Sequence, residues 1–179
     1  TNDGGYIIAA TNLSNDFWET SIWIIKIDSN GSHLWNKTLS QDNFYSRASK
    51  ALQTADGSYI VAGITNLDDP KFSSRPKFWL IKLYSNGTIQ WDKILILNSS
   101  VIHSGIIHVA SSFQQTTDGG YVISGGWPYL VIKTDSSGTE QWNKSYRNPP
   151  GFGGSIPFGN SAIFSFSFWT GNGDGAQIF

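Results

Sequence analysis

One short motif occurs three times in this 179-residue chain, and it constrains the fold more than any other feature. The copies begin at Asp3, Asp56 and Asp118 and read DGGYIIA, DGSYIVA and DGGYVIS. An Ile-Lys segment, a short turn containing Ser and Gly, and a Trp follow each copy. A repeat of this size is one supersecondary unit that cannot bury its own faces. The sequence therefore predicts neighbouring units that stack on one another.

The copies can be aligned with one another, which identifies equivalent positions without any homologue. The alignment places one Lys and one Trp at fixed positions in the second half of every repeat: Lys26, Lys82, Lys133, Trp35, Trp91 and Trp142. The segment between the Tyr-containing strand and the Ile-Lys strand differs in length from copy to copy. Variable loops on a rigid scaffold are where recognition residues usually lie.

Each complete repeat is predicted to form four short antiparallel strands, because β-branched and aromatic runs alternate with Asp-Gly and Asn-Gly turns. The expected strands are 49–54, 58–64, 78–84 and 89–95 in the second repeat, and 110–116, 120–125, 129–134 and 140–146 in the third. The first repeat lacks the first of its four strands, because the chain begins at the turn. Nearly continuous apolar strands predict burial on both faces.

The pattern Gln-x-Thr-x-Asp-Gly-Gly-Tyr, followed by Trp-Leu-Ile-Lys and then Trp-x-Lys, resembles a propeller-type repeat of large secreted or surface proteins of archaea and some bacteria. Gln53-Thr54 and Gln115-Thr116 carry the resemblance together with the repeated motif, over residues 1–147. It implies an all-β fold of β-propeller blades with four antiparallel strands, incomplete or part of a larger propeller. Closed propellers contain about four to eight blades. We therefore expect other blades, from the same or neighbouring chains, as partners.

The chain divides into a repeat region, a linker and a tail. The three repeats are predicted at about 1–40, 48–95 and 109–147. Paired Pro and Gly residues indicate a linker at 148–160, and 161–179 is either a set of capping strands or the start of a second β domain. The tail faintly resembles the early strands of an L-type lectin jelly roll, which would give Asp174 a sugar contact.

Composition and sequons bear on location and partners. The net charge is −1 and Lys/Arg runs are absent, which argues against nucleic acid as a partner. No apolar stretch approaches the roughly 20 residues of a membrane span. Six Asn-x-Ser/Thr triplets predict an extracellular or cell-surface glycoprotein, unless the chain simply favours Asn and Ser in its turns. The candidate N-glycosylation sites are Asn12, Asn30, Asn36, Asn86, Asn98 and Asn143.

The candidate chemistry is weak. The Asp of each repeated turn could bind a metal, but capping of the turn backbone is the favoured interpretation. Asp28 starts a segment that superficially resembles a calcium loop, yet Tyr84 occupies the equivalent place in the second repeat. Two nearby histidines, His103 and His108, lack a third ligand for zinc. The sequence thus predicts no catalytic, cofactor-binding or metal site, and no enzyme.

Aromatic residues give two further expectations. The Trp repeated on the last strand is expected to pack between blades rather than to stack on sugars, since a Trp contributes a large buried area. The loop residues Trp18 and Trp127 are better candidates for ligand binding.

The sequence favours a non-enzymatic structural or adhesion segment of an extracellular or cell-surface protein. One alternative is a carbohydrate-binding module that uses the loops or the tail around Asp174, with glycans as partners. A second is a subunit of a surface filament or layer, and a third is an enzyme whose site is assembled with blades that this chain does not contain.

Overall fold

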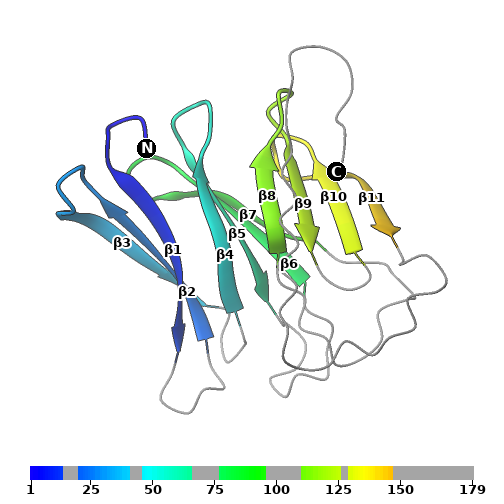
Figure 1. Cartoon of the computed structure of the whole chain (residues 1–179), viewed down its shortest axis with the longest axis horizontal. Coiled ribbons are helices and arrows are strands. Elements are labelled where there is room, and N and C mark those ends of the chain that lie inside the picture. The colour runs from blue at the N-terminus through cyan, green and yellow to red at the C-terminus, as the bar shows by residue number, and fades with distance from the viewer. Residues whose placement is uncertain (14–19, 41–45, 66–76, 96–109, 126–128, 147–179) are drawn as a thin grey trace.

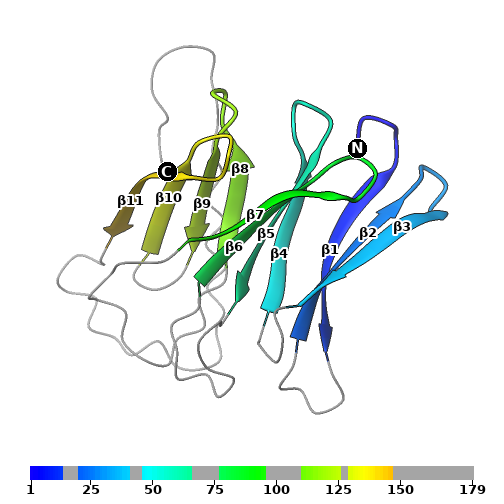
Figure 2. The ribbon, with the colours of Figure 1, turned by 180° about the vertical axis from the view of Figure 1, so that it is seen from behind.

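The computed structural model describes residues 1–13, 20–40, 46–65, 77–95, 110–125 and 129–146. Eleven β-strands and no helix occur in these ranges. The strands form three antiparallel sheets that lie side by side in chain order (Figure 1 and Figure 2). The predicted all-β class is therefore confirmed. In the ranges described, no helix is long and apolar enough to cross a membrane.

Each sheet is a meander in which strands adjacent in sequence are hydrogen-bonded neighbours. The first sheet contains β1 (Tyr6–Leu13), β2 (Thr20–Ile27) and β3 (His33–Leu39). The second contains β4 (Ser46–Gln53), β5 (Tyr59–Thr65), β6 (Lys77–Leu83) and β7 (Ile89–Leu95). The third contains β8 (Ala110–Gln115), β9 (Tyr121–Gly125), β10 (Tyr129–Thr134) and β11 (Glu140–Tyr146). The repeat thus corresponds to one sheet.

The predicted strand bounds agree with the structure for β7, β10 and β11 and differ slightly elsewhere. The largest difference is at β4, which begins at Ser46 rather than at residue 49. Thr20 of the first sheet holds this start: its Oγ1 donates to the Ser46 carbonyl at 2.7 Å and accepts from the Ser46 N–H at 2.8 Å. The earlier start depends on a contact between sheets, which local sequence does not encode.

The first strands of the second and third sheets share a β-bulge at the same repeat position. Pairing of β4 with β5 skips one residue between Ala48 and Lys50, and pairing of β8 with β9 skips one between Ala110 and Ser112. A bulge bends a strand and increases its local twist. The two complete units are therefore alike in backbone as well as in sequence.

Two hydrophobic layers hold the sheets together, one on each side of the second sheet. Strand β5 alternates between them: Tyr59 and Val61 face the first sheet, whereas Ile60 and Ala62 face the third. The layer between the first two sheets contains Ile22, Ile24, Tyr59, Val61, Trp79, Ile81 and Leu83. The other contains Ile60, Ala62, Ile64, Phe78, Leu80, Leu95, Phe113, Tyr121, Ile123, Leu130 and Ile132. The expected burial on both faces is confirmed for β5 and β6, the two inner strands of the second sheet.

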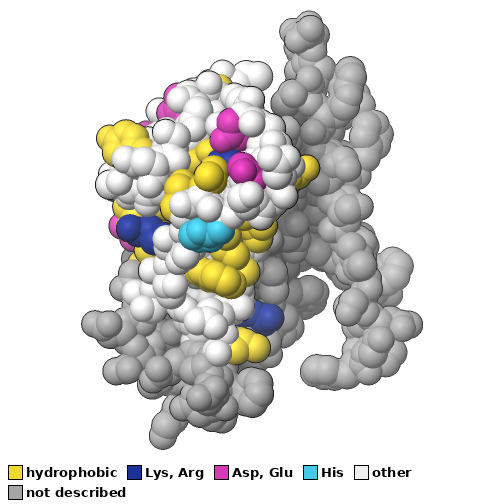
Figure 3. All heavy atoms as spheres, turned by 90° about the vertical axis from the view of Figure 1, so that its left-hand side faces the viewer, with side chains coloured by type: hydrophobic (Ala, Val, Ile, Leu, Met, Phe, Trp, Pro, Cys, Tyr) yellow, Lys and Arg dark blue, Asp and Glu magenta, His cyan; other side chains and the backbone are white. Residues whose placement is uncertain are grey.

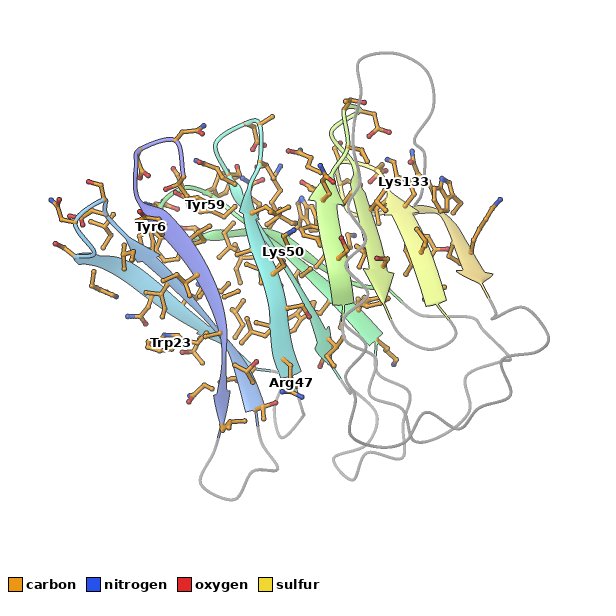
Figure 4. The ribbon with its side chains drawn as sticks, in the orientation of Figure 1. Tyr6, Trp23, Arg47, Lys50, Tyr59 and Lys133 are labelled. Atoms are coloured by element: carbon orange, nitrogen blue, oxygen red, sulfur yellow. The ribbon has the colours of Figure 1, made fainter. Side chains whose placement is uncertain are left out.

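The first sheet departs from that expectation. Along β2 the side chains of Ile22 and Ile24 point inward and are buried. Trp23, which lies between them in sequence, points to the other face and is 39% exposed. Figure 4 shows Trp23 on the outer side of the first sheet and Tyr59 in the space between the first two sheets. An apolar strand sequence predicts two buried faces only where a neighbour covers both. Among the described residues, a sheet covers just one face of the first sheet.

Candidate functional site: the repeated contacts within and between sheets

The repeated Asp and the repeated Lys form an ion pair in every sheet. Lys Nζ lies 2.9 Å from the carboxylate in Lys26–Asp3, 2.7 Å in Lys82–Asp56 and 2.8 Å in Lys133–Asp118. The lysine side chains are nearly buried (2, 8 and 10% exposed), whereas the three aspartates are about half exposed (55, 54 and 56%). A buried ammonium needs a partner. The Asp supplies it from the preceding turn.

The same Asp carboxylates cap the turns, as the sequence predicts. Asp3 accepts from the N–H of Gly5, and Asp118 accepts from the N–H of Gly120, both at 3.0 Å. In the second repeat, Asp56 accepts from the N–H of Ser58 at the same distance. The residue before that N–H is a Gly with positive φ, 80° at Gly57, which an L side chain adopts only with strain. Turn formation thus fixes the carboxylate that meets the lysine.

These hydrogen bonds stabilise the charged carboxylates. The Lys82 ammonium, the Thr54 hydroxyl and the N–H of Ser58 hold the pKa of Asp56 well below its ordinary value. For Asp118 the equivalent donors, led by Lys133, lower the pKa in the same way. At Asp3 the Thr1 hydroxyl lowers the pKa most, followed by Lys26. Burial opposes the charged form of Lys82, but its hydrogen bond with Asp56 raises the pKa on balance.

The repeated Trp joins one sheet to the next. Trp35 of the first sheet packs on Tyr59 of the second, with ring centroids 6.0 Å apart. Trp91 of the second sheet packs on Tyr121 of the third at 6.1 Å. The expectation of packing between repeats is confirmed at both junctions.

Each of these two Trp rings also covers a turn glycine of the following sheet. A Cβ atom added at Gly87 would lie 3.0 Å from Trp35 Cε3, and one at Gly138 would lie 2.7 Å from Trp91 Cζ3. Trp35 Nε1 further donates to the carbonyl of Ser85 at 3.2 Å. The missing side chain of the glycine therefore makes room for the indole.

A repeated Gln forms a third connection between sheets. The Gln53 side chain accepts from the N–H of Asn2 in the preceding sheet at 2.6 Å, and Gln115 accepts from the N–H of Ala55 at 3.0 Å. Each Gln also donates to the turn of its own sheet, at the carbonyl of Gly57 or Gly119. The Gln-x-Thr part of the motif therefore links neighbouring repeats.

Sequence reasoning identified the repeated Lys, Trp and Gln positions. It did not identify the partners of the Lys and the Gln. It assigned the Asp to the turn alone and left the Lys unexplained. A signal was present: a charged residue recurs inside an apolar strand, and the carboxylate repeated in all three copies is the turn Asp. A buried Lys requires a counter-charge, so the pairing could have been inferred.

The predicted ligand and metal features can be placed only in part. Trp18, Trp127 and Asp174 lie outside the described residues, as do the linker at 148–160 and the tail at 161–179. Within the ranges described, no group of three or more His, Asp or Glu side chains could hold a metal ion. The carboxylate of Asp28 caps its own turn by accepting from the N–H groups of Asn30 and Ser32. A role for the three ligand candidates stays a prediction.

Five of the six sequon asparagines fall in described segments, and all five are exposed: Asn12, Asn30, Asn36, Asn86 and Asn143. Asn30 and Asn86 lie in turns, and the others lie on strands. The sixth, Asn98, lies outside the described residues. Exposure is compatible with modification, which stays a prediction.

Comparison with known proteins finds no matching family model and no matching curated protein.

Proposed function

We propose that the three sheets are blades of a β-propeller and that the chain is a non-enzymatic structural or adhesion segment of an extracellular or cell-surface protein. The recurrence of one interface supports this proposal more than any other observation. At both junctions a Trp packs on the Tyr and covers the turn Gly of the next sheet, while a Gln accepts a hydrogen bond from the preceding turn. These repeated residues serve stacking, which is how radial sheet repeats bury their faces.

The chemistry of the repeated charged residues fits the same role. The Lys Nζ of each repeat is bound by the turn Asp, and in the third repeat Lys133 also donates to the carbonyl of Thr134 at 2.8 Å. A carboxylate already occupied by a turn N–H, a hydroxyl and an ammonium has little capacity left for proton transfer or a metal. The three repeated Lys–Asp pairs therefore serve the scaffold.

Modification at the exposed sequons tests the extracellular location. Protein from its natural source would be released from intact cells by brief protease treatment and then deglycosylated enzymatically in heavy-oxygen water, which marks each formerly glycosylated Asn. We expect marked peptides that contain Asn86 and Asn143, which are exposed on the second and third sheets. Unmarked Asn at all sites, with no peptide released from intact cells, would contradict the proposed location.

A subunit of a surface filament or layer is a second candidate. It is supported by the outer faces of the row of sheets. Figure 3 looks onto the outer side of the first sheet and shows hydrophobic side chains across it. Tyr6, Ile8, Trp23 and Leu34 of this sheet are 57, 38, 39 and 52% exposed. Open, apolar sheet faces of this kind favour association.

A further inference from the structure

The outer face of the first sheet matches surfaces that are buried elsewhere in the same chain. By the repeat alignment, Tyr6, Ile8 and Trp23 are equivalent to Tyr59, Val61 and Trp79 of the second sheet. The first three side chains are 57, 38 and 39% exposed, whereas the second three are 2, 0 and 3% exposed. We name the surface formed by Tyr6, Ile8 and Trp23 with the turn at Gly31 the head face.

The third set of equivalents agrees with the second. Tyr121, Ile123 and Leu130 of the third sheet are 0, 0 and 6% exposed, because the second sheet covers them. Thus the same pattern of side chains is buried by a preceding sheet twice in this chain. No sheet among the described residues covers the head face.

The turn glycines show the same asymmetry. Gly87 and Gly138 are buried beneath Trp35 and Trp91, but a Cβ atom added at Gly31 would have no heavy atom within 4 Å. All three have nearly the same backbone conformation, with φ of 83°, 83° and 79° in chain order. Gly31 is therefore a preformed seat for an indole ring that no described Trp occupies.

The opposite end of the row carries the unmatched indole. Trp142 is 43% exposed, although its equivalents Trp35 and Trp91 are partly buried against the next sheet. Val122 and Val131 lie on the same side of the third sheet as Trp142 and are only partly buried. We name the surface of these three residues the tail face.

We propose that the tail face of one copy of this chain binds the head face of a second copy, with Trp142 packed on Tyr6 and over Gly31 of the partner copy. Two interfaces with the same contacts occur inside the chain and support a second copy as the partner. Each of them joins a face equivalent to the tail face to a face equivalent to the head face. The contact is heterologous, so each copy keeps one free head and one free tail. The inference deepens the filament candidate and needs no assumption about location. It requires that Asn36, which pairs with Ile25 on the head face, carries no glycan.

The interface is expected to be weak to moderate. The head face spans three strands of up to eight residues, or roughly 14 Å by 26 Å. That footprint is well below the roughly 800 Å² that each partner buries in a standard specific interface, and is typical of a weak contact. In the described residues the first sheet has three strands, none of them equivalent to β4, so the Gln connection is not part of the proposed contact. Association should therefore depend on concentration in the micromolar range or above.

Complementation between two variants tests the proposal. Tyr6→Lys places a charge on the head face, and Trp142→Lys places one on the tail face. Sedimentation velocity of the full chain should show concentration-dependent association of the wild type and monomers of each variant alone. A mixture of the two variants keeps one intact head and one intact tail, so it should form a heterodimer of twice the 19.7 kDa mass and nothing larger.

Tyr84→Lys is the matched control, because Tyr84 is 53% exposed but lies in a turn of the second sheet, outside both faces. It should associate like the wild type, and the urea midpoints of all variants should show that each is folded. A wild type that stays monomeric, an equal effect of the control, or a mixture that stays monomeric would overturn the proposal. None of these outcomes would bear on the glycosylation test of the proposed location.

Discussion

At the scale of single residues, the repeated Asp has two tasks. It caps the turn that precedes its strand and neutralises the Lys from the next strand, as in Asp56 with Ser58 and Lys82. The first task is local in sequence and the second joins residues 26 positions apart. The Lys is buried and the Asp is half exposed. Removing the Asp side chain should therefore cost more stability than removing the Lys, because it leaves a buried ammonium without its partner.

Replacement of Asp56 by Ala should therefore lower the free energy of unfolding by about 1–2 kcal/mol, since it leaves the Lys82 ammonium buried without its carboxylate. Asp28→Ala is the control, because Asp28 caps a turn through the N–H groups of Asn30 and Ser32. The control should lose only the cap, about 0.5–1 kcal/mol. Urea unfolding measures both variants. Equal losses would show that the ion pair adds nothing to the turn.

The lowered pKa values of Asp3, Asp56 and Asp118 predict sensitivity to acid. A carboxyl with a lower pKa in the folded than in the unfolded state binds fewer protons when folded. Its stabilisation is present above about pH 4, the ordinary Asp pKa, and is lost as the pH falls below that value. The urea midpoint should thus decline steeply below about pH 4.

The triple variant Asp3→Asn, Asp56→Asn, Asp118→Asn should have a lower midpoint at neutral pH and a flatter decline in acid. An acid decline as steep as that of the wild type would mean that other carboxyls govern the transition.

At the scale of elements, the hairpin turn between the last two strands of a sheet also forms part of the interface with the preceding sheet. Gly87 and Gly31 occupy the same turn position with the same φ of 83°. They differ in surroundings, because Trp35 covers Gly87 and nothing lies within 4 Å of a Cβ at Gly31. Comparing the two positions separates two reasons for glycine. Both positions have the positive φ, but only Gly87 lies beneath a Trp ring.

Gly31→Ala should cost about 1–2 kcal/mol through backbone strain alone. Gly87→Ala should cost the same plus about 1 kcal/mol or more, because its Cβ would press on the Trp35 ring. Both variants would be compared by urea unfolding at low protein concentration, where the chain is monomeric. If Gly87→Ala costs no more than Gly31→Ala, the indole can shift without penalty and the seat is looser than the structure shows.

At the scale of the whole molecule, the described sheets form an open row rather than a closed ring (Figure 1). Each junction is a separate interface, so stability should approximate a sum over sheets and junctions. Trp residues at equivalent positions in the repeat should therefore contribute differently to the free energy of unfolding, depending on whether a following sheet covers them.

Trp91→Ala should lower the free energy of unfolding by about 2 kcal/mol, less than a fully buried Trp because its side chain is only partly buried. Trp142→Ala should change the monomer's stability by no more than about 0.5 kcal/mol, as expected for an exposed site. Chemical denaturation at low concentration checks both. A large loss for Trp142→Ala would show that its ring is already engaged within the single chain.

The sequence alone determined the strands, the turns and the equivalence of the repeats, because turn glycines, Asp caps and apolar runs act within a few residues. Thus β7, β10 and β11 could be bounded from sequence, whereas the start of β4 depends on Thr20 in another sheet. The all-β class follows from the same local signals.

The tertiary structure decided which equivalent residues are buried and what they contact. Tyr6 and Tyr59 are the same residue in the same motif, yet one is 57% and the other 2% exposed. Burial depends on whether a neighbouring sheet lies across the face, and this is a property of position in the row. For the same reason, the Trp seat at Gly31 and the unmatched Trp142 could be identified only once the sheets were seen stacked.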